Sequence, residues 1–430
     1  MNNNPSNWLS HRPALPISST PTGVNWGGFR GLVKQYPGSS AAYSLRKIGS
    51  GPVVRLRRSS DSAESDFAAV ELAGSVTGSE RATNGDFSTG DLTGWSAAAN
   101  FSVNGGNQLV CDGLQAGRVE CTQTAICPET GDENYYKLSF NIISCSDFTD
   151  AGIRLASNSF STCEFSDMGI NSAGQYSILI NTSLCTNKEF DIFCQIGVTL
   201  TIDNISMKEY QPNAAELWAF GTPLSSKGFV GDNAWAYVTT WYDQSGSGND
   251  AVQATAAAQP RLITAGVVET DNGKPAIVFD GVDDTLTATM SGFAHTDAFC
   301  VMGTADTTFY FPTNRDEGAG WAGWLADDGS ASTTIIGGQY SSGSNVLRVN
   351  GADQSPATRD DVHTLLSTDT QLLVSDIDAA TANWTEFNWG ADYATAEYGG
   401  RLQEWIIYGS DQSANRVGIE ANINDHYGIY

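Results

Sequence analysis

The stretch Ala236–Asp250, AYVTTWYDQSGSGND, constrains the fold more than any other part of the 430-residue chain. Its first half is a run of β-formers that ends at Tyr242, and its second half is polar, with Gly246 and Gly248 two residues apart. β-Branched and aromatic residues favour a strand, whereas closely spaced glycines interrupt one. The stretch therefore predicts a core strand that runs into a loop rich in side-chain oxygens.

That loop carries carboxylate and amide groups on Asp243, Gln244 and Asn249. These three are candidate ligand-binding residues, for a sugar or a cation. The alternative is that the same side chains brace their own loop, because Asx residues bond nearby backbone amides in glycine turns. On that alternative, an Asp243→Ala change lowers stability more than it lowers any sugar affinity.

Long stretches with a 3.6-residue period are nearly absent, whereas short alternating runs separated by glycine, serine and asparagine are frequent. This pattern predicts an all-β protein built of short strands. The expected strands lie at Tyr43–Leu45, Val54–Leu56, Ile277–Phe279, Cys300–Gly303, Val346–Val349, Leu365–Ser367 and Gly400–Tyr408. A short helix or turn is expected at Glu216–Gly221. A longer helix is expected at Ser413–Tyr427, with Ser413 as its N-cap and Gly428 as its C′ residue.

The net charge of −26 is unevenly distributed along the chain. Residues 1–60 hold eight Lys or Arg and no Asp or Glu, which leaves 14 basic and 48 acidic residues, a balance of −34, in the rest. A phosphate backbone would repel such an acidic body, so no nucleic-acid partner is expected. No apolar run approaches the length of about 18 residues that a membrane-spanning helix needs, so no membrane partner is expected either.

Residues 1–38 are predicted to form an extended N-terminal arm. Five of the 13 prolines fall in it, together with Trp8, Trp26, Phe29 and Tyr36. Prolines favour extended conformations, and large aromatic residues spaced along an arm indicate that it lies on a surface. We expect the basic arm to anchor the chain on something acidic, either a neighbouring protein or its own body. The first residues have neither a basic start nor an apolar segment, so no signal peptide is expected.

Seven of the eight cysteines lie between Cys111 and Cys194, without CxxC spacing, and the four histidines are scattered. A zinc site is therefore not expected. Without a signal peptide, the prediction is reduced and mostly buried thiols, with oxidation after release from a cell as the alternative.

Residues 79–212 resemble a galactose-binding-like jelly roll of the carbohydrate-binding modules, inserted into a second domain. The resemblance rests on NGDFSTGDLTGW from Asn84 and TLTIDNISMKEY at Thr199–Tyr210. It implies that Asp86 and Asp203 either share a structural Ca²⁺ or serve as turn residues. It also makes Trp95 the first aromatic to test for stacking on a sugar ring, with a place in the core as the alternative.

The flanking segments, residues 39–78 and 213–430, resemble one discontinuous concanavalin A-like (laminin G-like) β-sandwich. They are similar to the catalytic domain of α-L-arabinofuranosidase B, on the segments AYSLRKI, VVRLRRSSDSAESDF, AYVTTWYDQSGSGNDAVQ, NGKPAIVFDGVDDTL and GRLQEWIIYGS. In that family the nucleophile is a Glu after a G-A-G segment, but residues 318–323 here read GAGWAG and hold no carboxylate. Asp392 corresponds to the acid/base residue of the family. A retaining glycosidase needs two carboxyl groups, so a lone Asp392 argues against catalysis.

Domains of this pattern are also frequent in predicted proteins of tailed bacteriophages and of marine bacteria, where they resemble non-catalytic adhesion or virion modules. The leading hypothesis is a non-catalytic virion protein, a head decoration, head fibre or tail-associated component, that displays β-sandwich domains for adhesion or glycan binding. The arm would contact other virion proteins, and the many copies of a homo-oligomer would add avidity for a cell-surface or environmental polysaccharide. The expected location is the virion, assembled in the host cytoplasm. The alternatives are a retaining α-L-arabinofuranosidase-like glycosidase and a bacterial surface adhesin.

Overall fold

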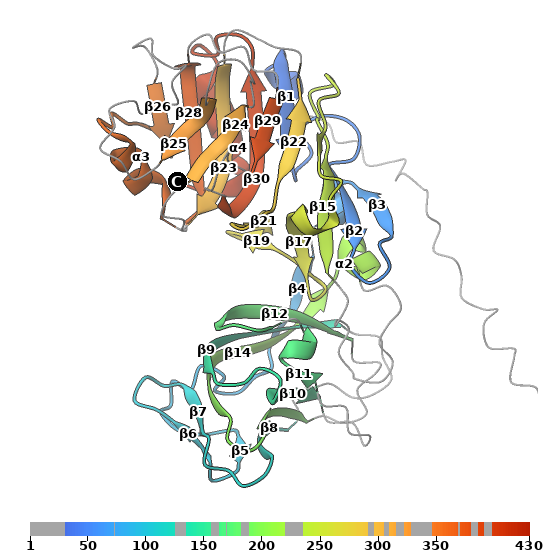
Figure 1. Ribbon diagram of the computed structural model, residues 1–430, viewed down its shortest axis with the longest axis vertical. Helices are drawn as coiled ribbons and strands as arrows, with labels where there is room; N and C mark the ends of the chain where they lie inside the picture. The colour runs from blue at the N-terminus through green and yellow to red at the C-terminus, as the bar shows by residue number, and fades with distance from the viewer. Residues whose placement is uncertain are drawn as a thin grey trace, which may run out of the picture.

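The computed structural model describes residues 31–72, 74–124, 135–155, 163–168, 170–181, 189–219, 235–290, 296–304, 309–314, 322–327, 346–368, 370–379, 386–390 and 398–430. Most regular elements within these ranges are β-strands, which confirms the prediction of an all-β chain. The strands form antiparallel sheets in two groups, the upper and lower parts of Figure 1. Among these residues no helix is long and apolar enough to cross a bilayer.

The first group takes its strands from both ends of the chain. It comprises β1 (Ser39–Ser44), β2 (Val54–Arg58), β3 (Glu64–Phe67), β15 (Ala236–Trp241), β16 (Ala251–Val252), β17 (Arg261–Thr264), β18 (Val267–Val268), β21 (Ile277–Asp280), β22 (Leu286–Thr289), β23 (Thr296–Thr304), β24 (Phe309–Asn314), β25 (Ala322–Asp327), β26 (Val346–Val349), β27 (Ala352–Asp353), β28 (Leu372–Ala379), β29 (Glu386–Trp389) and β30 (Gly399–Tyr408). A small hairpin, β19 (Thr270–Asp271) and β20 (Lys274–Pro275), stands beside them. β30 pairs with both β1 and β23, so the two ends of the chain share one hydrogen-bonded set.

The second group lies between β3 and β15 in the sequence and forms two sheets. The five-stranded sheet has the order β11 (Cys163–Glu164), β10 (Ala151–Leu155), β13 (Phe190–Cys194), β8 (Val119–Gln123) and β5 (Ser96–Ala97). The six-stranded sheet contains β12 (Gly174–Asn181), β9 (Tyr135–Cys145), β14 (Thr199–Gln211), β7 (Leu109–Asp112) and β6 (Phe101–Val103), with β4 (Ser75–Glu80) on β14. β4 straddles the predicted domain limit at residues 78 and 79. The limits themselves stay predictions.

The strand at the start of residues 236–250, β15, supplies part of the core of the first group. β15 ends at Trp241, whose ring packs on Trp389 at 6.1 Å between centroids. Trp389 in turn contacts Tyr43 at 5.0 Å and Trp405 at 6.2 Å. All four side chains are fully buried. The strand predicted for this stretch is therefore confirmed as a core strand.

The last helix is present, but it begins later than predicted. α4 spans Arg416–Tyr427, buries Ile419 and Ile423, and ends on Gly428 at φ 67°, so the predicted C′ residue is confirmed. The prediction of Ser413 as its N-cap is wrong. The carbonyl of Gln412 accepts the N–H of Arg416, and the N–H of Gln412 donates to Asp297, so this segment forms a separate turn held on β23.

The strand predicted at Leu365–Ser367 is wrong, because a helix ends there. α3 (Arg359–Leu366) begins with a capping box: Thr358 Oγ1 accepts the N–H of Asp361, and the Asp361 carboxylate accepts the N–H of Thr358. That reciprocal cap satisfies two orphan N–H groups of the first turn. The short helix predicted at Glu216–Gly221 is confirmed as α2 (Ala214–Ala219) over the described residues.

The end of the predicted arm lies on the chain's own body. Leu32–Gln35 form one helical turn, α1, where the sequence predicts an extended segment. Leu32 is buried in a cluster with Ile48 and with α4, and the hydroxyl of Tyr408 donates to the carbonyl of Tyr36 at 3.0 Å. Residues 1–30 lie outside the described residues, so the arm's partner stays a prediction.

Four of the five thiols that the structure describes are buried, as predicted. Cys111, Cys121, Cys194 and Cys300 are buried, Cys145 is partly buried, and none of the five is in a disulfide. The side chains of the other three cysteines lie outside the described part of the chain.

Candidate functional site

Both carboxylate oxygens of Asp243 accept hydrogen bonds from other groups of the chain. Its Oδ1 accepts the N–H groups of Ala42 and Ser245, each at 2.9 Å, and its Oδ2 accepts the Ser245 hydroxyl and the Asn249 N–H. The bond to Ala42 joins the loop to β1, about 200 residues earlier in the chain. The Asx bonding predicted for Asp243 is therefore present, and it extends beyond the loop.

Gln244 and Asn249 fasten the same loop to the segment around β1. The Gln244 side chain is 2% exposed and uses both ends of its amide. Its Nε2 donates to the carbonyls of Ser44 and Arg46, and its Oε1 accepts the N–H groups of Ile48 and Gly49. Asn249 Nδ2 donates to the Ser40 carbonyl at 2.9 Å. These bonds show what the predicted binding residues do within the chain, and their ligand-binding role stays a prediction.

Trp95 lies inside the second group of strands. It is 8% exposed and packs between Phe87 and Phe190, with centroids at 5.7 and 6.1 Å. Its Nε1 donates to the carbonyl of Thr83 at 3.0 Å. Because both the ring and the N–H have partners inside the body, its environment is that of a core residue.

Asp86 and Asp203 come within electrostatic range of each other. The backbone bond from the Ile205 N–H to the Gly85 carbonyl, 2.8 Å long, joins their two segments. Burial is the main cause that raises the pKa of Asp203, and the charge of Asp86 adds to it. Two neighbouring carboxylates are oxygen donors of the kind that Ca²⁺ takes, and backbone carbonyls would have to complete its shell. The shared Ca²⁺ therefore stays a prediction.

Asp392 lies outside the described residues, as does most of the segment 318–323 that was compared with the nucleophile strand. The glycosidase alternative therefore stays a prediction from the sequence.

A carboxylate cluster forms at the acidic turn after β21. Oxygens of Asp280, Asp283 and Asp284 lie within 4.8 Å of one another. The Asp280 carboxylate accepts three N–H groups of this turn, and Asp284 Oδ2 accepts the N–H of Asp280. Burial, followed by the charge of Asp280, raises the pKa of Asp284 to about 7. These bonds within the turn explain the geometry of the cluster.

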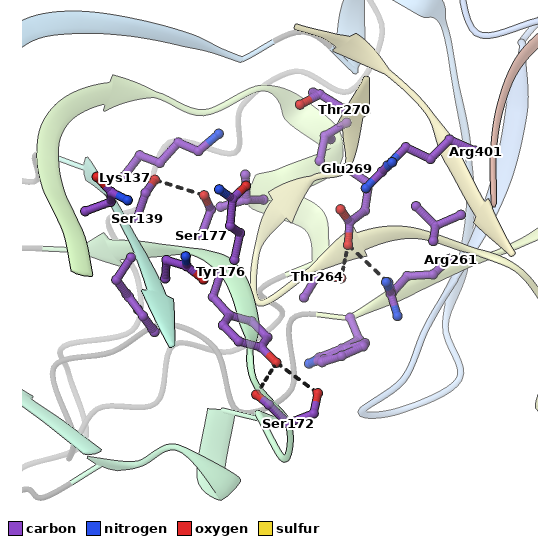
Figure 2. Close-up of a pocket in the computed structure, with 18 of the residues that line it drawn as sticks. Lys137, Ser139, Ser172, Tyr176, Ser177, Arg261, Thr264, Glu269, Thr270 and Arg401 are labelled. Atoms are coloured by element: carbon purple, nitrogen blue, oxygen red, sulfur yellow. Dashed lines mark hydrogen bonds and ion pairs between the residues drawn. The ribbon is translucent and has the colours of Figure 1, made fainter. Parts of the chain in front are cut away.

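The structure also contains a cleft between the two groups of strands, with a volume of about 740 Å³. One wall is the outer face of β9 and β12 in the six-stranded sheet, and the other is formed by β17, β18 and the residues around them (Figure 2). We call it the central cleft. Its first wall contributes Lys137, Ser139, Phe140, Asn141, Asn171, Ser172, Gln175, Tyr176, Ser177 and Asn204, and its second wall Trp235, Arg261, Thr264, Val267, Val268, Glu269, Thr270, Val278 and Arg401.

The polar row on the first wall follows from the alternation of β9. Leu138, Phe140 and Ile142 are buried in the core, so the intervening side chains point to the other face. The register pairs these outward residues with those of β12: Lys137 with Leu179, Ser139 with Ser177, and Asn141 with Gln175. The two serine hydroxyls are 2.9 Å apart. The row thus runs from amides at one end to an ammonium at the other.

The second wall is centred on Glu269. Its carboxylate accepts a bond from Arg261 Nε at 3.1 Å and another from the Thr264 hydroxyl. Arg261 and Arg401 approach Glu269 from two sides (Figure 2). Glu269 is the carboxylate among the described residues that line the cleft. Its bonds to neighbouring groups leave the cleft with an excess of cationic side chains.

Three aromatic side chains line the cleft, Phe140, Tyr176 and Trp235, and each packs on a neighbouring ring. The Trp235 ring stacks on Tyr237, 6.4 Å between centroids, and the Arg261 guanidinium lies 5.3 Å from its centroid. Tyr176 is half-buried, packs on Phe140 at 6.0 Å, and donates its hydroxyl to the Ser172 carbonyl. Trp235 is therefore covered by its neighbours, and Tyr176, which stands opposite Phe140 in the register, packs against the core of the second group.

A buried carboxylate fixes the two walls relative to each other. Glu216 of α2 is 0% exposed, and its Oε1 accepts both the Val268 N–H and the Tyr210 hydroxyl at 2.9 Å. Val268 belongs to the second wall, and Tyr210 lies on β14 beside the first. Leu179, Tyr210 and Val267 form a small apolar cluster at the same junction. The hydrogen bonds of Glu216 and this apolar cluster thus close the cleft at this end.

Sequence reasoning missed the central cleft. The available signal is the alternation YYKLSFN at residues 135–141, which predicts a polar outer face on the strand. Nothing in that pattern indicates that residues 261–270, more than 100 positions later, cover this face.

The comparisons with known proteins give the following. No protein-family model matches the chain, and no curated protein matches it. Among solved structures, an arabinofuranosidase complexed with arabinofuranosyl-α-1,2-xylobiose is similar over 91% of this chain and 64% of that chain, at 12% identity and a TM-score of 0.34. The tandem CBM51 modules of a family 98 glycoside hydrolase from Streptococcus pneumoniae are similar over 83% of this chain and 88% of that chain, at 10% identity and a TM-score of 0.15. At these scores neither likeness bears on the site, and the fold rests on the sheets described above.

Proposed function

We propose that this chain is a non-catalytic β-sandwich protein that binds glycans through the central cleft. The observation that carries the proposal is the row of hydroxyl and amide side chains on the outer face of β9 and β12, which lines a cavity of about 740 Å³. Ligand sites of this size commonly lie where two bodies meet and place a few polar groups on a concave wall. Sugar hydroxyls can hydrogen-bond to such hydroxyl and amide side chains. These bonds replace the ones that both partners make to water before binding.

The lining favours binding over hydrolysis. A retaining glycosidase needs two carboxyl groups about 5–5.5 Å apart, and an inverting one needs two at a larger separation. Among the described residues, Glu269 is the carboxylate of the cleft lining, and Arg261 and Thr264 hold it. A single paired carboxylate supplies neither mechanism.

Calorimetric titration with a panel of neutral and acidic oligosaccharides tests the proposal. We expect binding by the native chain, and a loss of at least tenfold in affinity for the double variant Asn141→Ala/Gln175→Ala. Neither of these side chains has a hydrogen bond within the described part of the chain, so their removal leaves the fold intact. The matched control is Gln211→Ala, an exposed amide on the same sheet that does not line the cleft. Equal affinities of the double variant and the control would overturn the proposed site.

The same preparations test for turnover. We expect no release of the aryl group from an aryl α-L-arabinofuranoside. Turnover that an Asp392→Asn variant abolishes would replace the binding proposal with the glycosidase alternative.

We further propose that the chain is a structural component of a bacteriophage particle. Support comes from the sequence: a basic, aromatic-bearing stretch of residues 1–38 in front of an acidic body, and the resemblance of the body to domains found in phage proteins. Many copies on one particle would give avidity to a weak site. Mass spectrometry of purified particles tests this role, and particles that lack the chain would rule it out.

A further inference from the structure

We propose that the central cleft selects sugars carrying an anionic group, a carboxylate or a sulfate, and that Lys137 is the residue that binds this group. The inference rests on the proposed function, because it names the class of glycan that the same cleft would take. Its starting point is a cation that the fold places at the closed end of the cleft without an ion pair or hydrogen bond in the described part of the chain.

Lys137 occupies a fixed position at that end. On β9 it stands opposite Leu179 of β12, and Leu179 is buried against Val267 across the junction. The Lys137 ammonium lies 5.7 Å from the centroid of the Tyr210 ring, which holds the side chain by a cation–π contact. Within the described ranges the ammonium has no hydrogen bond and no ion pair. Its three N–H donors are therefore available to a ligand.

The position is costly for a cation. Burial lowers the pKa of Lys137, and the charges of Glu216 and Glu269 oppose that effect only in part. An ammonium taken out of water without a partner destabilises the fold unless something compensates it. A ligand anion at the closed end would supply that compensation, so the cost of holding Lys137 there is recovered on binding.

The other charged groups around the cleft do not cancel this preference. Arg261, Arg401 and Glu269 lie on the second wall, and Arg261 donates directly to the Glu269 carboxylate. Among the described residues of the lining, three side chains are cationic and one is a carboxylate, and the buried Glu216 lies behind the junction. The surrounding chain is strongly acidic, so the attraction for an anion is local and short-ranged rather than a property of the whole surface.

The polar row gives the ligand a direction. From Lys137 to Asn141 the strand rises four residues, roughly 13 Å at the usual rise per residue. The hydroxyls of Ser139 and Ser177 lie between these ends, and Gln175 stands opposite Asn141. A saccharide longer than one ring would place its anionic group on Lys137 and its neutral hydroxyls on the serines and amides.

Titration calorimetry with three sets of tetrasaccharides tests the inference. One set carries uronic acids (galacturonic, glucuronic, mannuronic and guluronic), and the second is the same set with its carboxyl groups reduced to alcohols. The third set consists of sulfated galactan fragments, whose sugars carry no carboxyl group. We expect the native chain to bind one of the anionic sets at least tenfold more tightly than the reduced set. The set that binds identifies the anion as carboxylate or sulfate.

Lys137→Gln should remove that preference, and Lys137→Arg should retain most of it. The control is Lys47→Gln, an exposed lysine outside the cleft lining, which should leave the preference unchanged. Equal binding of the reduced set, or a preference that survives in Lys137→Gln, would overturn the role of Lys137 while leaving glycan binding in place. Absence of binding to every set would instead remove the proposed function itself.

Discussion

Two regions of this molecule are rich in polar side chains, and they differ in where those side chains find their partners. In the loop at residues 243–250, the carboxylate of Asp243 and the amide of Gln244 are bonded to backbone groups on every side. On the outer face of β9, Lys137 and Asn141 have no such bonds within the described chain. A polar group satisfied by its own backbone stabilises the fold, whereas one left without a partner in a cleft is available to a ligand.

The largest expected effect is loss of stability on removing Gln244. Gln244→Ala leaves two carbonyls and two N–H groups without their partner in a buried site. We expect the free energy of unfolding to fall by about 4 kcal/mol, since each unsatisfied buried group costs about 1–3 kcal/mol and water will reach some of them. Denaturant unfolding monitored by tryptophan fluorescence measures it. A change below about 1 kcal/mol would mean that this loop is not the brace described here.

Asp243→Ala should be the next largest. The change removes the acceptor of four bonds, one of which reaches β1 through Ala42. The expected loss is about 3 kcal/mol, somewhat less because Asp243 is only half-buried. Glycan affinity, measured on the same folded variant by calorimetry, should stay within twofold of the native value. Loss of affinity without loss of stability would turn the loop back into a binding site.

Asp284 shows that internal bonds do not make every polar group stabilising. Burial raises the pKa of Asp284 in the folded state to about 7, well above its usual range, so the folded chain keeps this acid protonated at mildly acidic pH. The folded state then binds more protons than the unfolded state between about pH 4 and 7, so this group's contribution to stability is lost as pH rises through that window. Asp284→Asn keeps the oxygen that accepts the Asp280 N–H. We expect it to raise the free energy of unfolding by about 2 kcal/mol at pH 8 and to change little at pH 4.

The matched control for this pH effect is Asp283→Asn, because Asp283 is exposed in the same turn. It should leave the pH profile of denaturant unfolding nearly unchanged. A profile that flattens in both variants alike would assign the effect to the charge of the turn rather than to the burial of Asp284.

The smallest expected effect is a gain in stability, whereas Gln244→Ala and Asp243→Ala are expected to lose stability. Lys137→Met replaces a partly buried, unpaired ammonium with an apolar chain of similar length. Because burial lowers the pKa of Lys137, its charged form costs stability below that pKa, and the variant should be more stable by about 1 kcal/mol at pH 7. Thermal unfolding by calorimetry checks the rise. A variant that is less stable would show that Lys137 serves the fold.

Much of the first region could be predicted from the sequence, because its signals are local. A run of β-formers that ends in glycines and Asx residues specifies a strand and a braced turn, and Trp241 and Asp243 occupy the places so predicted. The end of α3 is predicted as a strand because Leu365–Ser367 follows the other short strands at the spacing of a sandwich, and that spacing takes no account of the cap at Thr358 and Asp361. That cap was readable in the sequence.

The central cleft could not be predicted in the same way. Its first wall follows from the alternation of β9, but the wall that covers it comes from β17 and β18, over 100 residues later. The contact between the two walls depends on one buried carboxylate, Glu216, which accepts bonds from Tyr210 and Val268. No local sequence pattern predicts these bonds. Tertiary placement of an ordinary polar strand face created the site.

Hydrogen–deuterium exchange with and without the tightest-binding tetrasaccharide compares the two regions in one measurement. If the cleft is the binding site, ligand should slow amide exchange in residues 135–145, 170–181 and 261–270, the two walls of the central cleft. No change is expected in residues 236–250, where the bonds are complete without ligand. Slower exchange confined to residues 236–250 would contradict this expectation, and would make the loop the binding site and the cleft a gap between two packed bodies.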